Sequence, residues 1–190
     1  MPGDIIISTV LIAIFILFSG FFSSSEAAFL SLQRTRLTYL VNNNVPGAKR
    51  VQDMINNTDR LLSTILLGNN LVNVAFTALV TALAVSWLGE GPLALTAATV
   101  IGTTVLLILG EIIPKSIAVK KSEKMTFLYA RPLKMVELSL YPIILFLQWL
   151  SRATQTIFGH EANGDDRAVT EGELRMLIDI GESEGSVDSI

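Results

Sequence analysis

Gly110-Glu111-Ile112-Ile113-Pro114-Lys115 sets a carboxylate between a glycine and a proline at the end of a long uncharged run. Pro114 has no backbone N–H to donate within a helix, and Gly110 tolerates non-helical dihedral angles. We therefore expect the carbonyls around Glu111 to turn away from helical hydrogen bonding. Carbonyl and carboxylate oxygens are the ligands that hard cations prefer, so the stretch predicts a cation site. The alternative is an ion pair between Glu111 and Lys115, four residues apart at a helix end.

The composition predicts an all-α polytopic membrane protein. The chain of 190 residues is 51% hydrophobic and 16% charged, with a mean hydropathy of +0.55, which is too apolar for a soluble domain of this size. It contains no cysteine and one histidine, His160. Disulfides, thiolate metal sites, cysteine nucleophiles and histidine zinc clusters are therefore excluded. We expect no enzymatic activity and no nucleic-acid partner.

The first predicted span covers residues 5–30. Its apolar run up to Phe22 carries no charge and is long enough to cross a bilayer. Because the basic start and the cleavage motif of a signal peptide are missing, we interpret it as a retained membrane helix. The serines at 23–25 bring hydroxyl groups into the span, and we expect a helix break near Gly20 that frees carbonyls as well. The alternative is that small side chains here only allow close helix packing.

Basic residues mark the connection after this span as cytoplasmic. Five of them occupy it: Arg34, Arg36, Lys49, Arg50 and Arg60. Short connections rich in Lys and Arg stay on the inner side of a membrane, so the N-terminus is predicted to lie outside. Apolar faces flank the turn-rich stretch Asn42-Asn43-Asn44-Val45-Pro46-Gly47, which predicts a cytoplasmic helical hairpin over residues 33–58.

Two further spans are predicted at residues 61–88 and 93–113, joined by a short external turn. Three amides interrupt the apolar run of the second span: Asn69, Asn70 and Asn73. An asparagine carbonyl can bind a hard cation without adding charge. The alternative is that these amides only hydrogen-bond to neighbouring helices. With the N-terminus outside, the serines, the amides and Glu111 all fall in the cytoplasmic half, so we predict that they converge on one site.

The rest of the chain is predicted to stay on the cytoplasmic side. Residues 125–158 contain too short an uncharged run to cross, and Tyr141-Pro142 interrupts it, so we expect a kinked juxtamembrane helix. Residues 1–160 then form the transmembrane domain. Residues 161–190 are predicted to be a polar linker and an acidic helix with capping-box spacing at its start, the beginning of a cytoplasmic region that continues beyond this sequence.

Four ordered motifs resemble the CorC/cyclin M family of magnesium transporters. Each motif alone is weak, but together they are specific and extend over nearly the whole chain. They are Phe18-Ser19-Gly20-Phe21-Phe22-Ser23-Ser24-Ser25-Glu26, Leu66-Leu67-Gly68-Asn69-Asn70-Leu71-Val72-Asn73, Gly110-Glu111-Ile112-Ile113-Pro114-Lys115, and Val169-Thr170-Glu171-Gly172-Glu173-Leu174 leading to Gly181-Glu182-Ser183-Glu184-Gly185. The resemblance implies a homodimer in the inner (plasma) membrane that exports Mg²⁺ coupled to Na⁺. It also implies ATP-regulated CBS modules beyond this chain.

Carried over position by position, the resemblance implies that the side chains of Ser24, Asn70 and Glu111 bind Mg²⁺, together with backbone oxygens of Ser23 and Gly110. The residues themselves leave the ion open, because one carboxylate with neutral oxygens suits Mg²⁺ or Ca²⁺. They also leave the sodium coupling open. The alternative function is a membrane anchor and dimerisation module for a cytoplasmic regulatory domain, with the polar clusters acting only as helix contacts.

Overall fold

The structure, a computed structural model, describes residues 2–157, and every regular element in this range is a helix. The elements are α1 (Pro2–Ser31), α2 (Arg34–Asn42), α3 (Ala48–Asn56), α4 (Thr58–Leu88), α5 (Pro92–Val105), the π-helix η1 (Leu106–Ile112), α6 (Ile113–Lys120), α7 (Ser122–Ser139) and α8 (Tyr141–Ile157). This confirms the all-α prediction. The acidic helix predicted within residues 161–190 lies outside the described range.

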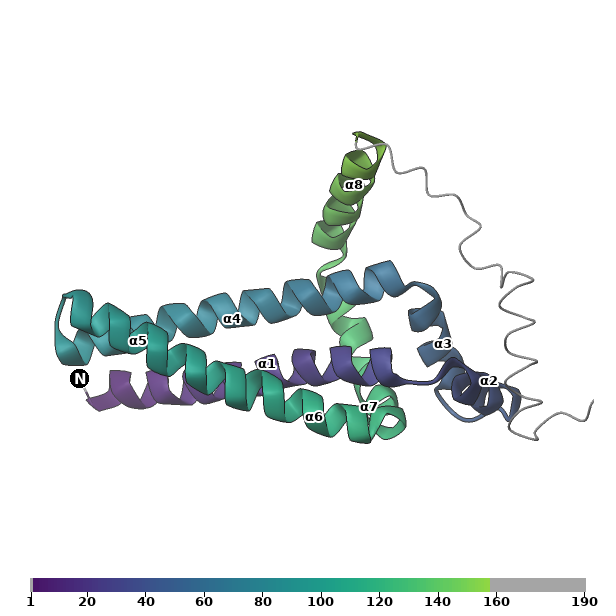
Figure 1. The fold of residues 1–190 in the computed structure, drawn as a ribbon, viewed down its shortest axis with the longest axis horizontal. Helices are drawn as coiled ribbons and strands as arrows, with labels where there is room; N and C mark the ends of the chain where they lie inside the picture. The colour runs from purple at the N-terminus through teal and green to yellow at the C-terminus, as the bar shows by residue number, and fades with distance from the viewer. Residues whose placement is uncertain (1, 158–190) are drawn as a thin grey trace, which may run out of the picture. The chain divides into compact units, whose positions relative to one another are not determined.

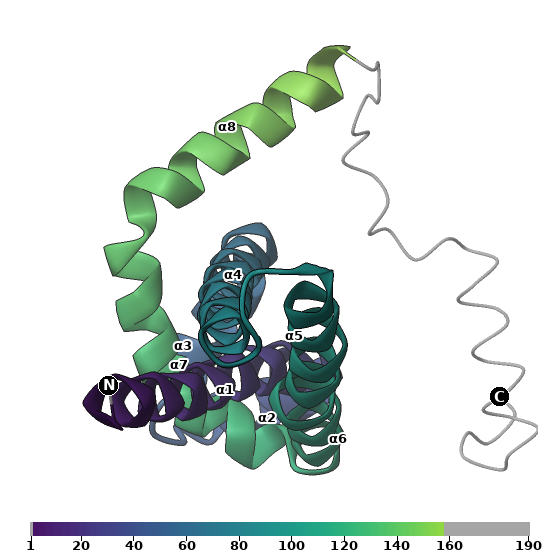
Figure 2. The ribbon, with the colours of Figure 1, turned by 90° about the vertical axis from the view of Figure 1, so that its left-hand side faces the viewer.

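Within residues 2–157, three helices are long and apolar enough to cross a membrane. They extend over Ile6–Ser31, Thr58–Leu88 and Pro92–Lys120, the last through α5, η1 and α6. In Figure 1 the three run alongside one another, with α1 and α4 in opposite directions, and Figure 2 shows α1, α4 and α5 as neighbours when viewed from one end. Many large apolar side chains on these helices point outward. The chain is therefore an all-α polytopic membrane protein.

The helix break that we expected near Gly20 is wrong, because α1 is one continuous helix. The hydroxyl groups of two serines that follow Gly20 form hydrogen bonds within the same helix. Ser24 Oγ donates to the Gly20 carbonyl (2.5 Å) and Ser25 Oγ donates to the Phe21 carbonyl (2.7 Å). Gly20 instead allows close packing, since a Cβ at this position would lie 3.2 Å from Cγ of Pro114 on α6. The small residue brings α1 and α6 together.

The third span changes its helical form without breaking. In η1 the hydrogen bonds reach one residue further than in an α-helix, and the N–H of Ile113 donates to the carbonyl of Ile108. Gly110 and Glu111 both lie in this wider turn. Pro114 cannot donate to the Gly110 carbonyl at α-helical spacing, because it has no N–H. The expected departure from α-helical bonding therefore occurs as a π-helix, a rare form that is frequent at functional sites.

The described chain also contains a helical hairpin and a bent helix pair. α2 and α3 form the hairpin, and Asn44 (φ 55°) and Gly47 (φ 90°) adopt left-handed backbone conformations in its turn. α7 and residues Tyr141–Leu150 of α8 meet at 75°. This bend lies in the region predicted to hold a kinked juxtamembrane helix. By length and apolarity the bent pair also qualifies as a broken fourth span.

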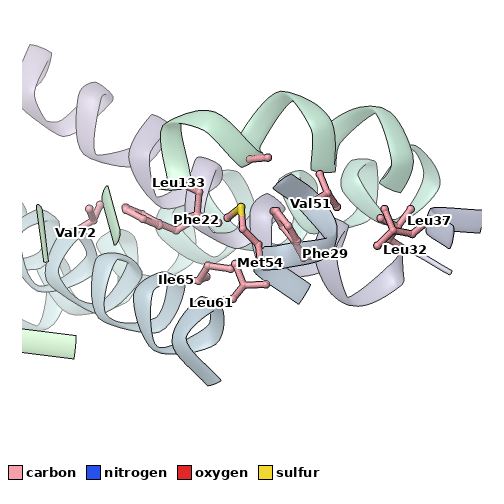
Figure 3. Packing of buried hydrophobic residues seen from close by; sticks show 11 residues of the cluster. Phe22, Phe29, Leu32, Leu37, Val51, Met54, Leu61, Ile65, Val72 and Leu133 are labelled. Atoms are coloured by element: carbon pink, nitrogen blue, oxygen red, sulfur yellow. The ribbon is translucent and has the colours of Figure 1, made fainter. Parts of the chain in front are cut away.

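A hydrophobic core connects the hairpin and α7 to the spans (Figure 3). It includes Phe22 on α1, Met54 on α3, Ile65 on α4 and Leu133 on α7. A Cβ on Gly68 would overlap the ring of Phe22, so α4 approaches α1 through a residue without a side chain. This contact lies directly beside the serines of α1 and the amides of α4, and it holds the two polar clusters against each other.

Candidate cation site

A chain of hydrogen bonds joins the three spans at one level. Ser19 Oγ on α1 donates to Asn73 Oδ1 on α4 (2.9 Å), and Asn73 Nδ2 donates to Glu111 Oε1 on η1 (3.1 Å). Ser19 Oγ also lies 3.5 Å from the carbonyl oxygen of Gly110. Glu111 is half-buried and Ser19 and Gly110 are buried. The serine, amide and Gly-Glu clusters thus lie together in the folded chain.

Two buried oxygens without partners lie one helical turn from this level. Ser23 Oγ on α1 and Asn69 Oδ1 on α4 accept or donate no hydrogen bond among the described residues. Ser23 is four residues after Ser19, and Asn69 is four residues before Asn73, which is about 6 Å along each helix. Because α1 and α4 run in opposite directions (Figure 1), both steps lead toward the hairpin end. Buried oxygens without partners are costly and are therefore candidates for binding a polar ligand.

The structure does not bring all five predicted ligands together. Gly110 and Glu111 belong to the hydrogen-bonded level, and Ser23 is buried one turn away. Ser24 hydrogen-bonds to its own helix and lines a separate, mainly apolar cavity of about 330 Å³. Asn70 is exposed and forms no side-chain hydrogen bond within the described residues. Occupation by an ion would therefore require Ser24 and Asn70 to reorient.

Lys115 does not pair with Glu111, so the alternative interpretation of this stretch is wrong for the structure. Lys115 Nζ lies 2.8 Å from Glu26 Oε2, which links α6 to α1. Glu111 bonds to Asn73 instead. Glu111 therefore forms no ion pair within residues 2–157, and its negative charge is balanced there only by the amide of Asn73.

Sequence reasoning placed Asn73 among the amides of the site but did not list it or Ser19 as a ligand. Ser19 carried a signal, because it lies one helical turn from Ser23 in the predicted serine cluster. The described residues contain no cluster of three or more His, Cys, Asp or Glu that could hold a metal. A cation here would rely on one carboxylate and on neutral hydroxyl, amide and carbonyl oxygens, which are ligands for Mg²⁺ or Ca²⁺ rather than for zinc or copper.

These features define a multi-pass α-helical membrane protein with an oxygen-rich polar site inside its spans. The model of the family described as cyclin M transmembrane N-terminal domain matches residues 10–189. The chain belongs to this family, as the four motifs indicated. Family membership supports a transport-related role for the membrane domain.

The relatives include proteins from bacteria and a plant. A UPF0053 protein of Haemophilus influenzae is 30% identical over 89% of this chain and 40% of its own length. The UPF0053 inner membrane protein YfjD of Escherichia coli is 30% identical over 84% of this chain and 37% of its own. The chloroplastic DUF21 domain-containing protein At1g55930 of Arabidopsis thaliana is 32% identical over 94% of this chain and 27% of its own length. The chain thus spans less than half the length of these relatives.

Proposed function

We propose that this domain exports Mg²⁺ across the inner membrane in exchange for Na⁺. The observation that supports a cation site best is the pair of buried, partnerless oxygens on Ser23 and Asn69, one turn from the Glu111 carboxylate. Apolar spans rarely keep such groups unless they serve a ligand or a pathway. A hydrated cation beside these oxygens would satisfy both through its bound water, and the Glu111 carboxylate would neutralise part of its charge.

In the proposed bound state Glu111, Ser24 and Asn70 supply side-chain oxygens, and Ser23 and Gly110 supply backbone oxygens. Mg²⁺ requires near-octahedral coordination by oxygen and gives up water reluctantly. Ser24 can reach the ion by a rotation about its Cα–Cβ bond, which releases the carbonyl of its own helix. Asn70 must turn inward, which requires a rotation of α4 about its axis. The Ser23 hydroxyl and the side-chain oxygen of Asn69 remain to hydrogen-bond the water that the ion keeps.

The proposed exit path follows from the order of the two polar layers, which are the partnerless oxygens of Ser23 and Asn69 and the hydrogen-bonded chain one turn away. With the predicted topology, the bonded chain from Ser19 through Asn73 to Glu111 lies on the extracellular side of the ion. An outward-moving ion must displace Asn73 from Glu111, so this hydrogen bond acts as the outer barrier of the site. Neutral oxygens favour release, because they bind a divalent cation less tightly than several carboxylates would. The exchange with Na⁺ rests on the resemblance of the four motifs.

We also propose that two copies form a homodimer. Asn70 is an exposed amide within a membrane span, and such an amide is costly against lipid alone. Neighbouring apolar side chains on α4, such as Leu66 and Leu71, are also exposed. A second copy that covers this face would shield Asn70 from lipid.

Titration calorimetry with MgCl₂ on the purified domain tests the cation site. Glu111→Gln keeps the shape of the side chain but removes its charge, so we expect binding to be lost while the helical content is unchanged. Glu90→Gln is the matched control, because Glu90 lies in the exposed turn between α4 and α5. Equal affinities of the wild type and Glu111→Gln would contradict the site. Absence of Mg²⁺ binding by the wild type would favour the anchor and dimerisation module, and Mg²⁺ efflux from vesicles that ignores the Na⁺ gradient would contradict the coupling.

A further inference from the structure

A charged cavity of about 410 Å³ lies between α3, the start of α4 and α7, apart from the candidate cation site. Its lining combines four cationic side chains with two carboxylates: Lys49, Arg50, Asp53, Arg60, Lys134 and Glu137. The net charge of the lining is therefore positive. The volume is many times the roughly 30 Å³ that one water molecule occupies, so the cavity has room for a polyatomic ligand.

A buried carboxylate fixes two of the four cations. The side chain of Glu137 is only 7% exposed, and its Oε1 lies 2.8 Å from Lys134 Nζ and 3.7 Å from Arg60 Nη1. Arg60 also packs over the ring of Tyr141, at 5.4 Å from the ring centroid. Two positive groups are thus held on one wall of the cavity by a single negative charge. Most donors of the Arg60 guanidinium are left for another acceptor.

The other two cations lack a partner. Lys49 and Arg50 are exposed and form no ion pair among the described residues. Both lie in the first turn of α3, which contains no acidic residue. Cations are disfavoured at the positive end of a helix, so two of them there are an electrostatic cost that an anion would relieve. Asp53, one turn later, offsets only part of this charge.

The cavity lies at the level where the second span begins. Arg60 and Leu61 both line it, and the uncharged run of α4 starts at Leu61. Phospholipid headgroups occupy this level of a membrane, and basic pockets at the cytoplasmic ends of spans bind anionic headgroups. The position thus combines a cationic cavity with ready access to phosphate.

We infer that this cavity binds a phosphate group, supplied by an anionic phospholipid of the adjacent leaflet or by a free phosphate anion. Arg60 offers a planar pair of N–H donors that matches phosphate oxygens, Lys134 adds a fixed charge beside it, and Lys49 and Arg50 on α3 supply two further positive charges in the lining. Bound phosphate ties α3, α4 and α7 together, so it stabilises the junction between the spans and the juxtamembrane helices. The inference is independent of which ion the domain transports.

Thermal unfolding of the detergent-solubilised chain tests the inference. Short-chain phosphatidylglycerol is titrated against short-chain phosphatidylcholine, and potassium phosphate against potassium chloride at equal ionic strength. We expect phosphatidylglycerol to raise the unfolding midpoint and phosphatidylcholine to leave it nearly unchanged. In Lys49→Gln/Arg50→Gln, which removes exposed and unpaired cations, the phosphatidylglycerol concentration for half of this effect should rise about tenfold.

A matched double variant separates a site from general attraction between charges. Arg34→Gln/Arg131→Gln removes the same charge from exposed positions that do not line the cavity, and we expect it to behave like the wild type. Stabilisation by potassium phosphate alone would assign the site to free phosphate, and stabilisation by phosphatidylglycerol alone would assign it to a headgroup. Stabilisation by both would mean that the cavity recognises the phosphate group itself. The inference is overturned if both double variants weaken the effect equally, or if neither phosphate source stabilises the chain.

Discussion

Gly110 and Ser19 approach each other so closely that no side chain fits between them. A Cβ on Gly110 would lie 2.8 Å from Ser19 Oγ and 3.1 Å from Ser19 Cβ. Both distances are shorter than ordinary van der Waals contact. The π-helical turn and α1 therefore meet backbone to side chain, and this approach places the Ser19 hydroxyl between Asn73 and the Gly110 carbonyl.

Gly110→Ala should therefore destabilise the domain by about 1–3 kcal/mol, because the added methyl group forces α1 and η1 apart. Unfolding by denaturant in micelles measures the change. Gly91→Ala is the control, since its Cβ would enter open space and its backbone is extended (φ −179°). Combining Gly110→Ala with Ser19→Gly should recover part of the loss. Equal effects of the two alanine substitutions would mean that the close approach of Gly110 and Ser19 does not affect the free energy of unfolding.

Asn70 and Asn73 should respond differently to alanine substitution. Asn73→Ala removes two hydrogen bonds between spans and should cost about 2 kcal/mol of stability. Asn70→Ala should leave stability within about 0.5 kcal/mol, because Asn70 is exposed, but it should lower Mg²⁺ affinity. Unfolding and calorimetry on both variants check this. Normal affinity in Asn70→Ala together with lost affinity in Asn73→Ala would move the amide ligand to Asn73.

Cysteine labelling tests the proposed orientation, and the sequence without native cysteine makes every introduced thiol unique. A membrane-impermeant maleimide added to intact cells should label Glu90→Cys but neither Asn43→Cys nor Ser186→Cys. Lys and Arg concentrate in the connection that holds Asn43, and the uncharged run before Ser186 is short and broken at Tyr141-Pro142. Labelling of Ser186→Cys from outside would show that the bent pair α7–α8 crosses the membrane.

The ion pair between α2 and α7 should make a small, pH-dependent contribution to stability. Arg36 Nε lies 2.9 Å from Glu123 Oε2, and this hydrogen bond, with the attraction of the guanidinium charge, lowers the pKa of Glu123. A lowered folded pKa stabilises the fold above the unfolded value of about 4.3, and this contribution disappears as the pH falls through the folded pKa.

Glu123→Gln should therefore unfold slightly more easily than the wild type at pH 7, and the difference should vanish at acidic pH. Unfolding midpoints of both proteins between pH 7 and pH 3 measure it. Both partners are about half exposed, so the effect is expected to be small and to weaken in high salt. A difference that persists at pH 3 would mean that the substitution perturbs packing rather than charge.

The spans could be predicted from the sequence because long runs of it contain no charged residue. The run between Arg60 and Glu90 has no charged residue, and α4 occupies Thr58–Leu88. An apolar run of this length has few alternatives to a membrane helix, because its backbone must be satisfied internally in lipid. Local composition therefore decided the fold class.

The residues of the site could not be predicted in the same way, because contacts between helices determine them. A glycine in an apolar helix can mark a helix break or a close contact with another helix. At Gly20 it is a close contact, and this depends on the packing of Pro114 on α6. Similarly, residues three apart on a helix differ by about 60° around its axis, so Asn70 and Asn73 share a face only loosely. The neighbouring helices decide which of the two points inward. The sequence therefore predicted that the clusters meet, but not which residues of each cluster are in contact.

The π-helical turn gives the third span one residue more than an α-helical path between the same ends would need. It is equivalent to a single-residue insertion between Val105 and Ile113. A single-residue deletion there would restore α-helical bonding while α5 and α6 kept their orientations. Pro114 would still face Gly20, and Lys115 would still reach Glu26. Only the Gly110-Glu111 turn would be lost, so at this locus a change in chain length is more selective than a change in residue type.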